Sequence, residues 1–148
     1  MHIYKGDDAL NIVVMDYKTV TSGDVSLKAF EDFGKVTYLP LTSPKNVAEA
    51  IKDADVVLCN KTPMTAENMS GAKNLKFIGL FATGYNNIDL DYTNTHGITV
   101  CNAGSYSTSA VVQHTFALLL EMTNRVAKYN EFTHNNGWCE SETFSPFI

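Results

Sequence analysis

Five short apolar segments recur along the first two thirds of the chain and constrain its fold more than any other feature of the sequence. Segments of this length and composition are typical of strands that are buried on both faces of a sheet. We expect strands at Leu10–Met15, Val36–Leu39, Val56–Cys59, Phe77–Phe81 and Ile98–Cys101.

Helix signals fill the stretches between these segments. Gly34 and Gly97 stand where the first and last of the predicted helices end. Ser43 and Pro44 suit the N-cap and first helical position of the second helix. Helices are predicted at Val25–Phe33, Val47–Ile51 and Ile88–Thr95, with a shorter turn of helix opening at Thr65-Ala66-Glu67.

The alternation of strands and helices predicts an α/β fold. Such a pattern usually gives parallel strands joined through right-handed crossovers. We therefore expect residues 1–104 to form an open, flavodoxin-like domain around a parallel five-stranded sheet. In this architecture ligands bind beyond the carboxyl ends of the strands, near the point where the strand order reverses.

The remaining residues, 105–148, differ in kind. One long helix is predicted over Thr108–Asn130, with Ser107 or Thr108 as its N-cap. Its apolar residues occupy more than one stripe, so more than one face should be buried. Because a five-stranded sheet can cover only one face, the pattern predicts that a partner surface covers the rest.

Composition narrows the possible partners. The net charge is −5 with both signs interspersed, which disfavours a nucleic-acid or anionic-membrane partner. The first residues are too polar for a signal peptide, and the apolar run Phe116–Leu120 is too short to span a bilayer. We expect a cytoplasmic protein whose cysteines, Cys59, Cys101 and Cys139, are reduced.

Several chemical motifs are missing from the sequence. The histidines and cysteines lack ligand spacing, so no metal site is expected. There is no G-x-G-x-x-G fingerprint, no P-loop and no G-x-S-x-G elbow. Asp16 follows the first predicted strand, as the acidic residues of phosphoacceptor domains do. However, the third strand ends in Asn60 and no second acid neighbours Asp16, which disfavours a site for a hard cation.

Two strand ends carry candidate binding residues. Thr83 and Gly84 follow the fourth predicted strand, where consecutive backbone N–H groups can form a small anion-binding concavity. An ordinary structural turn is the alternative. Lys61 follows the third strand and would add a positive charge to the same crevice, or else remain a solvated loop lysine. Asn86 and Asn87 are predicted to cap the next short helix.

Several longer motifs together resemble the D-2-hydroxyacid dehydrogenase family, nearest to its glycerate dehydrogenase or hydroxypyruvate reductase branch. They are VLCNKTPMT at Val57–Thr65, GYNNID at Gly84–Asp89, HGITVCN at His96–Asn102, the turn Tyr106-Ser107-Thr108 and VVQHTFALLL at Val111–Leu120. The resemblance extends from about Leu10 to the carboxyl end. It implies a flavodoxin-like substrate domain and a long helix that links it to a Rossmann domain for NAD(H).

The resemblance also implies roles for individual residues. Thr83 and Gly84 would bind the carboxylate of a small 2-keto acid, such as hydroxypyruvate or glyoxylate, through their backbone amides. Asn60 and Lys61 would lie beside this substrate.

A cofactor and a partner are implied in the same way. Asn102 and Thr115 would approach the nicotinamide end of NAD(H). The helix at Thr108–Asn130 would pack against its mate in a homodimer, which would explain why it is apolar on more than one face.

The family's glycine-rich cofactor loop, its arginine and its Glu–His pair are expected only after Ile148, and His114 and Arg125 do not match these positions. The Rossmann domain is thus expected to be absent from this chain, and the chain alone to be inactive. Two alternatives are a stand-alone module that binds a small carboxylate and a remnant that dimerises through the long helix.

Overall fold

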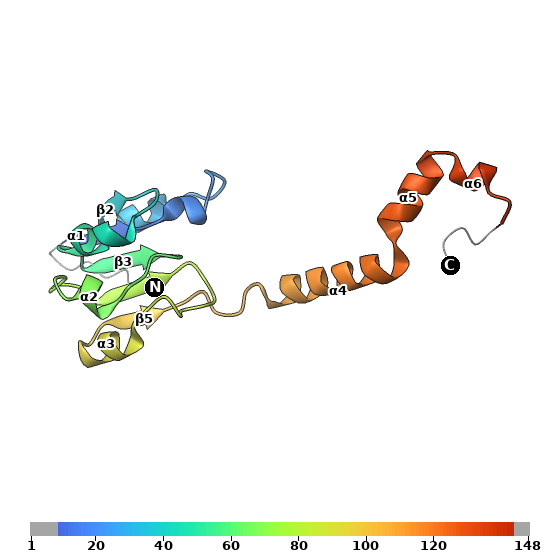
Figure 1. Ribbon diagram of the computed structural model, residues 1–148. Coiled ribbons are helices and arrows are strands. Elements are labelled where there is room, and N and C mark those ends of the chain that lie inside the picture. Colours follow the sequence, from blue (N-terminus) through green and yellow to red (C-terminus); the bar gives the residue numbers. More distant parts are fainter. Residues whose placement is uncertain (1–8, 144–148) are drawn as a thin grey trace. The chain divides into compact units, whose positions relative to one another are not determined.

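The computed structural model describes residues 9–143. The chain divides into two compact units, Met1–Ser105 and Tyr106–Ile148, and each is described by itself. Figure 1 shows the elements, with the strands in the first unit and helices α4, α5 and α6 in the second.

The first unit is built around a five-stranded, all-parallel sheet with the strand order β2-β1-β3-β4-β5. This is the flavodoxin-like order, so the predicted fold is confirmed. The strand order reverses between β1 and β3, which lie side by side. The strands are β1 (Leu10–Val14), β2 (Gly34–Tyr38), β3 (Val56–Cys59), β4 (Phe77–Leu80) and β5 (Thr99–Cys101).

The expectation that every strand is buried on both faces is correct only for the middle of the sheet. The last three residues of β1 and of β3 are all buried. The edge strands β2 and β5 contain no buried residue and alternate between half-buried and exposed positions. Edge strands have a neighbour on one side only, and here their outward-facing side chains reach solvent.

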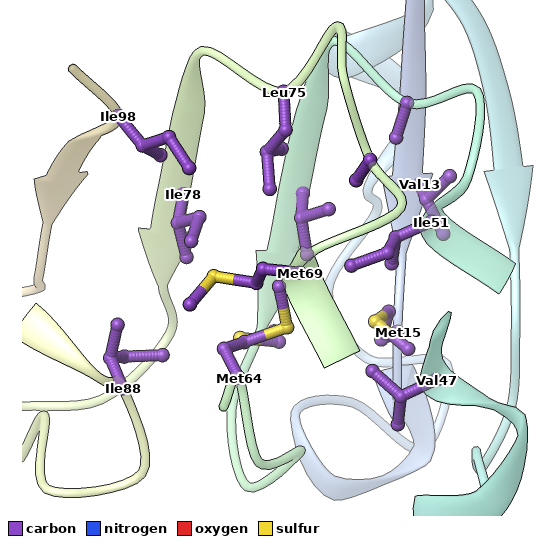
Figure 2. Close-up of a cluster of buried hydrophobic side chains, with 14 of the residues drawn as sticks. Val13, Met15, Val47, Ile51, Met64, Met69, Leu75, Ile78, Ile88 and Ile98 are labelled. Carbon is purple, nitrogen blue, oxygen red and sulfur yellow. The ribbon is translucent and has the colours of Figure 1, made fainter. Parts of the chain in front are cut away.

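Three short helices pack on one face of the sheet: α1 (Val47–Ile51), α2 (Ala66–Met69) and α3 (Leu90–Thr95). Between them and the strands lies the main hydrophobic core, drawn in Figure 2, which includes Val13 of β1 and Met15 directly after this strand. The predicted start of α2 is confirmed, because Thr65 Oγ1 accepts the N–H of Asn68 at 3.2 Å.

The opposite face of the sheet has a smaller core. Phe30, in the 3-10 helix Lys28–Asp32, packs on this face, and its ring meets that of Phe81 edge-on at a centroid distance of 6.1 Å. The fully buried members of this smaller core are Ile12, Val14 and Leu58.

The predicted helix at Val25–Phe33 is wrong. Only the short 3-10 helix at Lys28–Asp32 forms there. The Thr21 hydroxyl accepts the N–H of Val25, and the Asp24 carboxylate accepts the N–H of Ser22. Side chains that take up backbone donors in this way compete with an α-helix.

Of two further local predictions, the one for Gly34 is wrong and the one for Ser43 and Pro44 is confirmed in position. Gly34 does not end a helix but begins β2, where a Cβ would overlap the backbone of Leu10. Ser43 stands at the N-cap of the 3-10 turn Pro44–Asn46 that leads into α1, but its side chain makes no capping hydrogen bond.

The second unit contains α4 (Thr108–Asn124), α5 (Val126–His134) and α6 (Gly137–Glu140). The predicted single helix Thr108–Asn130 is therefore wrong: it is interrupted at Arg125, which has φ 51° and ψ 45°. Glu121 stabilises the break, because its backbone carbonyl accepts the Arg125 N–H and its carboxylate accepts the Ala127 N–H. In α4 and α5 no residue is buried. Within the described residues no helix is long and apolar enough to cross a membrane.

Candidate functional site

A buried carboxylate occupies the point where the strand order reverses. Asp16 lies just beyond β1, is only 4% exposed, and faces the loop that follows β3. Its Oδ1 accepts the backbone N–H of Asn60 at 2.9 Å. Its Oδ2 accepts those of Lys61 at 2.6 Å and Thr62 at 2.8 Å. The chain's own aspartate thus takes up the backbone donors at the position where this fold commonly binds ligands.

The role of Asp16 is one that sequence reasoning missed. A carboxylate that accepts several backbone N–H groups is well solvated by them, which offsets the cost of burying its charge. Asp16 also has φ 45°, a left-handed conformation that aspartate adopts more readily than most residues. An aspartate directly after a buried strand was the available signal for such a role. Its hydrogen-bond partners lie 44 to 46 residues away, so the sequence alone did not reveal them.

The side chain of Asn60 points toward the loop after β1. Its Nδ2 donates to Thr19 Oγ1 at 2.9 Å and to the Thr19 carbonyl at 3.3 Å. Thr19 Oγ1 in turn donates to the carbonyl of Asp16 at 2.8 Å. Lys61 comes next. Its backbone N–H is held by Asp16, and because the residue is exposed, its ammonium group is available to solvent or a ligand.

Asn87 connects this loop to the one that follows β4. Its Nδ2 donates to the carbonyl of Thr62 at 2.9 Å and to that of Asn60 at 3.4 Å. Its own carbonyl accepts the N–H of Met64 at 2.8 Å. The two strand-end loops are therefore joined side by side.

The predicted capping role of Asn86 and Asn87 is wrong. Asp89 is the N-cap of α3, and its Oδ1 accepts the N–H of Tyr92 at 2.9 Å. Neither asparagine has a positive φ. A capping side chain accepts from a backbone N–H one turn into the helix, and only Asp89 has the right spacing.

The loop at Thr83 and Gly84 is held by its carbonyl groups. Asn102 Nδ2 donates to the Thr83 carbonyl at 2.7 Å, and the N–H of Ala103 donates to the Ala82 carbonyl at 3.0 Å. The N–H groups of Thr83 and Gly84 donate to no residue within 9–143, and both residues are exposed. This strand end, unlike that of β3, presents unpaired backbone donors.

Nothing in the described fold requires glycine at position 84. Gly84 does not have a positive φ, and a Cβ there would meet only Asn86 Oδ1, at an ordinary contact distance of 3.6 Å. Beside this loop lies a hollow of about 190 Å³ lined by Tyr85, Leu90, Val100 and Asn102.

The two residues predicted near the cofactor already have local partners. The amide of Asn102 is engaged with Thr83, as described above. Thr115 belongs to the second unit and donates its hydroxyl to the carbonyl of Val111 at 2.9 Å, within α4. The residues described here contain no glycine-rich turn between a strand and a helix that could receive a pyrophosphate.

Cys59, at the end of β3, is unsuited to nucleophilic chemistry. Burial, with a contribution from the nearby charge of Asp16, raises the pKa of its thiol to about 12. The thiolate is the reactive form, so this cysteine is inert near neutral pH. Cys101 and Cys139 are exposed, and all three thiols are free. No group of three or more His, Cys, Asp or Glu residues in the described part could hold a metal ion.

Comparison with known proteins identifies the family. Residues 12–143 match the family described as D-isomer specific 2-hydroxyacid dehydrogenase, catalytic domain. The chain belongs to this family. A hydroxypyruvate reductase of Blautia hydrogenotrophica is 38% identical over 132 residues, which are 87% of this chain and 41% of that protein. A glycerate dehydrogenase of Methylorubrum extorquens is 28% identical over 105 residues, 71% of this chain and 33% of that protein.

Solved structures of a dehydrogenase and a reductase share the fold. A D-lactate dehydrogenase from Aquifex aeolicus, complexed with NAD and lactic acid, matches with a TM-score of 0.72 and 24% identity, over 93% of this chain and 40% of that one. An acyclic imino acid reductase in complex with NADPH and D-Arg has a TM-score of 0.73, 20% identity, and coverage of 94% and 44%. The chain thus spans less than half the length of these relatives.

Proposed function

We propose that this chain is the substrate-binding part of an NAD-dependent D-2-hydroxyacid dehydrogenase that reduces a small 2-keto acid of the hydroxypyruvate or glyoxylate type. The observation that carries the proposal is the pair of N–H groups at Thr83 and Gly84, which have no acceptor among residues 9–143 and lie at a strand end of a chain that belongs to this family. The names of the relatives, a hydroxypyruvate reductase and a glycerate dehydrogenase, support this substrate class.

In this proposal the backbone amides of Thr83 and Gly84 receive the substrate carboxylate. Backbone N–H groups bind anions without a charged side chain. At Gly84 the absence of a side chain leaves the amides open to a ligand. Ligand binding would therefore explain the glycine at this position, which the fold does not require. The carbonyl bonds from Asn102 and Ala103 keep the loop in place while its donors face outward.

Lys61 and Asn60 complete the proposed substrate site. The ammonium group of Lys61 is exposed and follows the strand next to β4. It would attract an anionic substrate and interact with its charge. Asn60 would lie beside the substrate through its carbonyl Oδ1, since its amide nitrogen is already bonded to Thr19.

The cofactor in this proposal is NAD(H). NAD(H) would supply the hydride in a whole enzyme of this family, and Asn102 and Thr115 would lie near its nicotinamide end. Because no glycine-rich phosphate turn occurs in the described part, we assign no step of hydride transfer to it. We expect this chain alone to bind the acid but not to reduce it.

The second unit would supply a dimer contact. We propose a boundary between residues 104 and 105, and a homodimer formed through the Thr108–Asn130 segment in the cytoplasm. The support is the number of large apolar side chains that α4 leaves more than half exposed, including Val111, Phe116, Leu118 and Met122. Apolar surface of this kind is typical of an interface.

Calorimetric titration of the chain with D-glycerate tests the substrate site. We expect saturable binding with a dissociation constant of about 1 mM, and no binding of uncharged glycerol. Gly84→Val should weaken binding about tenfold, because the new side chain would cover the amides. Gly71→Val is the matched control, since a Cβ at Gly71 meets nothing within 4 Å and this glycine lies on an exposed turn elsewhere. Equal affinity of Gly84→Val and the wild type would contradict the proposal.

A further inference from the structure

The loop segment 60–62 is held by hydrogen bonds to two side chains that lie far from it in the sequence. Its three N–H groups donate to the Asp16 carboxylate. The carbonyls of Asn60 and Thr62 accept from Asn87 Nδ2. Lys61 stands at the centre of this segment, so its backbone is held by bonds on both sides, while the residue is exposed.

Asp16 and Asn87, the two residues that hold this segment, have different positions in the fold. Asp16 follows β1 and is buried at the carboxyl end of this strand. Asn87 belongs to the loop after β4, three positions beyond Gly84. The Asn87 backbone adds a third connection by accepting the N–H of Met64, and the Met64 carbonyl accepts that of Asp89. Movement of one loop relative to the other would break several of these bonds at once.

We propose that Asp16 and Asn87 are positioning residues that hold the Lys61 ammonium group in register with the Thr83–Gly84 amides. The inference rests on the proposed function, because it assumes that Lys61 and these amides serve one ligand. Asp16 sets the conformation of the segment that carries Lys61. Asn87 joins this segment to the loop that carries the amides, so the cation and the N–H donors meet a small carboxylate as one preorganised unit.

A double-mutant cycle separates positioning from general stabilisation. D-glycerate affinity is measured for the wild type, Lys61→Met, Asn87→Ala and the double variant. We expect Lys61→Met to weaken binding about fivefold in the wild-type background and less than twofold beside Asn87→Ala. Asn86→Ala is the matched control, because the neighbouring Asn86 is exposed and does not hold segment 60–62. In the Asn86→Ala background, Lys61→Met should still weaken D-glycerate binding about fivefold.

Amide hydrogen exchange provides a second readout. Asn87→Ala should speed exchange at Lys61 and Thr62 while leaving the amide of Val57, inside β3, unchanged. Asp16→Asn should do the same more strongly. If this variant does not fold, Asn87→Ala alone decides the question, because its two contacts lie at the loop and not in the core.

The outcomes distinguish the inference from the proposed function. An equal loss from Lys61→Met in both backgrounds, with unchanged exchange at 60–62, would overturn the positioning role while leaving the carboxylate site intact. A loss below twofold in the wild-type background would also overturn it, because Lys61 would then not touch the ligand. Absence of any glycerate binding to the wild type would overturn the proposed function and, with it, this inference.

Discussion

The Asp16 carboxylate and the Lys61 backbone N–H are 2.6 Å apart, although 45 positions separate the two residues in the chain. This bond joins the ends of two neighbouring strands at the reversal of strand order. Because of this bond, the ends of β3 and β4 differ in the backbone donors that they offer to a ligand. At the end of β3 an internal carboxylate has taken the backbone donors, whereas at the end of β4 the donors of Thr83 and Gly84 remain unpaired within 9–143.

Replacement of Asp16 by alanine should destabilise the fold. The change leaves three N–H groups of the 60–62 segment without their acceptor, one of them buried and two partly buried, and we expect a loss of about 3 kcal/mol in the free energy of unfolding. Urea denaturation provides the measurement. Asp53→Asn, at an exposed aspartate, should change the stability by less than about 0.5 kcal/mol. A loss below about 1 kcal/mol for Asp16→Ala would show that the contact matters little.

The buried threonines Thr62 and Thr93 should respond oppositely to replacement by valine. Thr62 Oγ1 is buried without a partner among the described residues, whereas Thr93 Oγ1 donates to the Leu90 carbonyl at 3.1 Å. Thr62→Val therefore removes an unsatisfied hydroxyl and should be neutral or stabilising by up to about 1 kcal/mol. Thr93→Val removes a hydrogen bond and should cost about 1 kcal/mol. Melting temperatures in the reverse order would contradict this pair of assignments.

The cysteines should differ sharply in reactivity. With its pKa raised to about 12, Cys59 is a neutral thiol at pH 8.5, while Cys101 and Cys139 are exposed. Iodoacetamide at that pH should modify the two exposed thiols and reach Cys59 only after unfolding, as read by mass spectrometry. The raised pKa also means that folding keeps Cys59 protonated. Cys59 therefore leaves the free energy of unfolding unaffected by pH below the ordinary pKa of 9.0, and lowers it as the pH rises from 9.0 toward 12, where only the unfolded chain ionises this thiol.

Lys61 should contribute to carboxylate affinity through its charge. A partly solvated ion pair is worth about 1 kcal/mol, so Lys61→Met should weaken D-glycerate binding about fivefold and reduce its dependence on ionic strength. Lys73→Met, at another exposed lysine, should leave both quantities unchanged. If the two variants bind alike, Lys61 is a solvated loop residue.

The sheet could be predicted from the sequence because its determinants are local. Each strand overlaps one of the five predicted apolar segments. The alternation with helices then indicates parallel strands joined by crossovers, which the sheet has. The same reasoning located the two loops at the ends of β3 and β4. It could not predict the Asp16 and Asn87 bonds, because these depend on which loops lie side by side after folding.

The errors in the predicted helices have a local origin. The predicted helix at Val25–Phe33 has apolar residues at suitable positions, but Thr21 and Asp24 bind the backbone at its start. The break at Arg125 depends on one residue with φ 51°, which no glycine or proline marks in the sequence. The spacing of apolar residues predicts which face of a helix is buried. It does not predict that one residue adopts a different backbone conformation and ends the helix.

The most direct test is the set of backbone amide NMR signals that move when D-glycerate is added to the chain. Our account predicts that the signals of Thr83 and Gly84 shift in a saturable way, because their N–H groups are unpaired within 9–143. It also predicts that the N–H signals of 60–62 shift little, because Asp16 already holds them. Large shifts at 60–62 with none at Thr83 and Gly84 would contradict it, since the ligand would then have displaced Asp16 at the reversal of strand order.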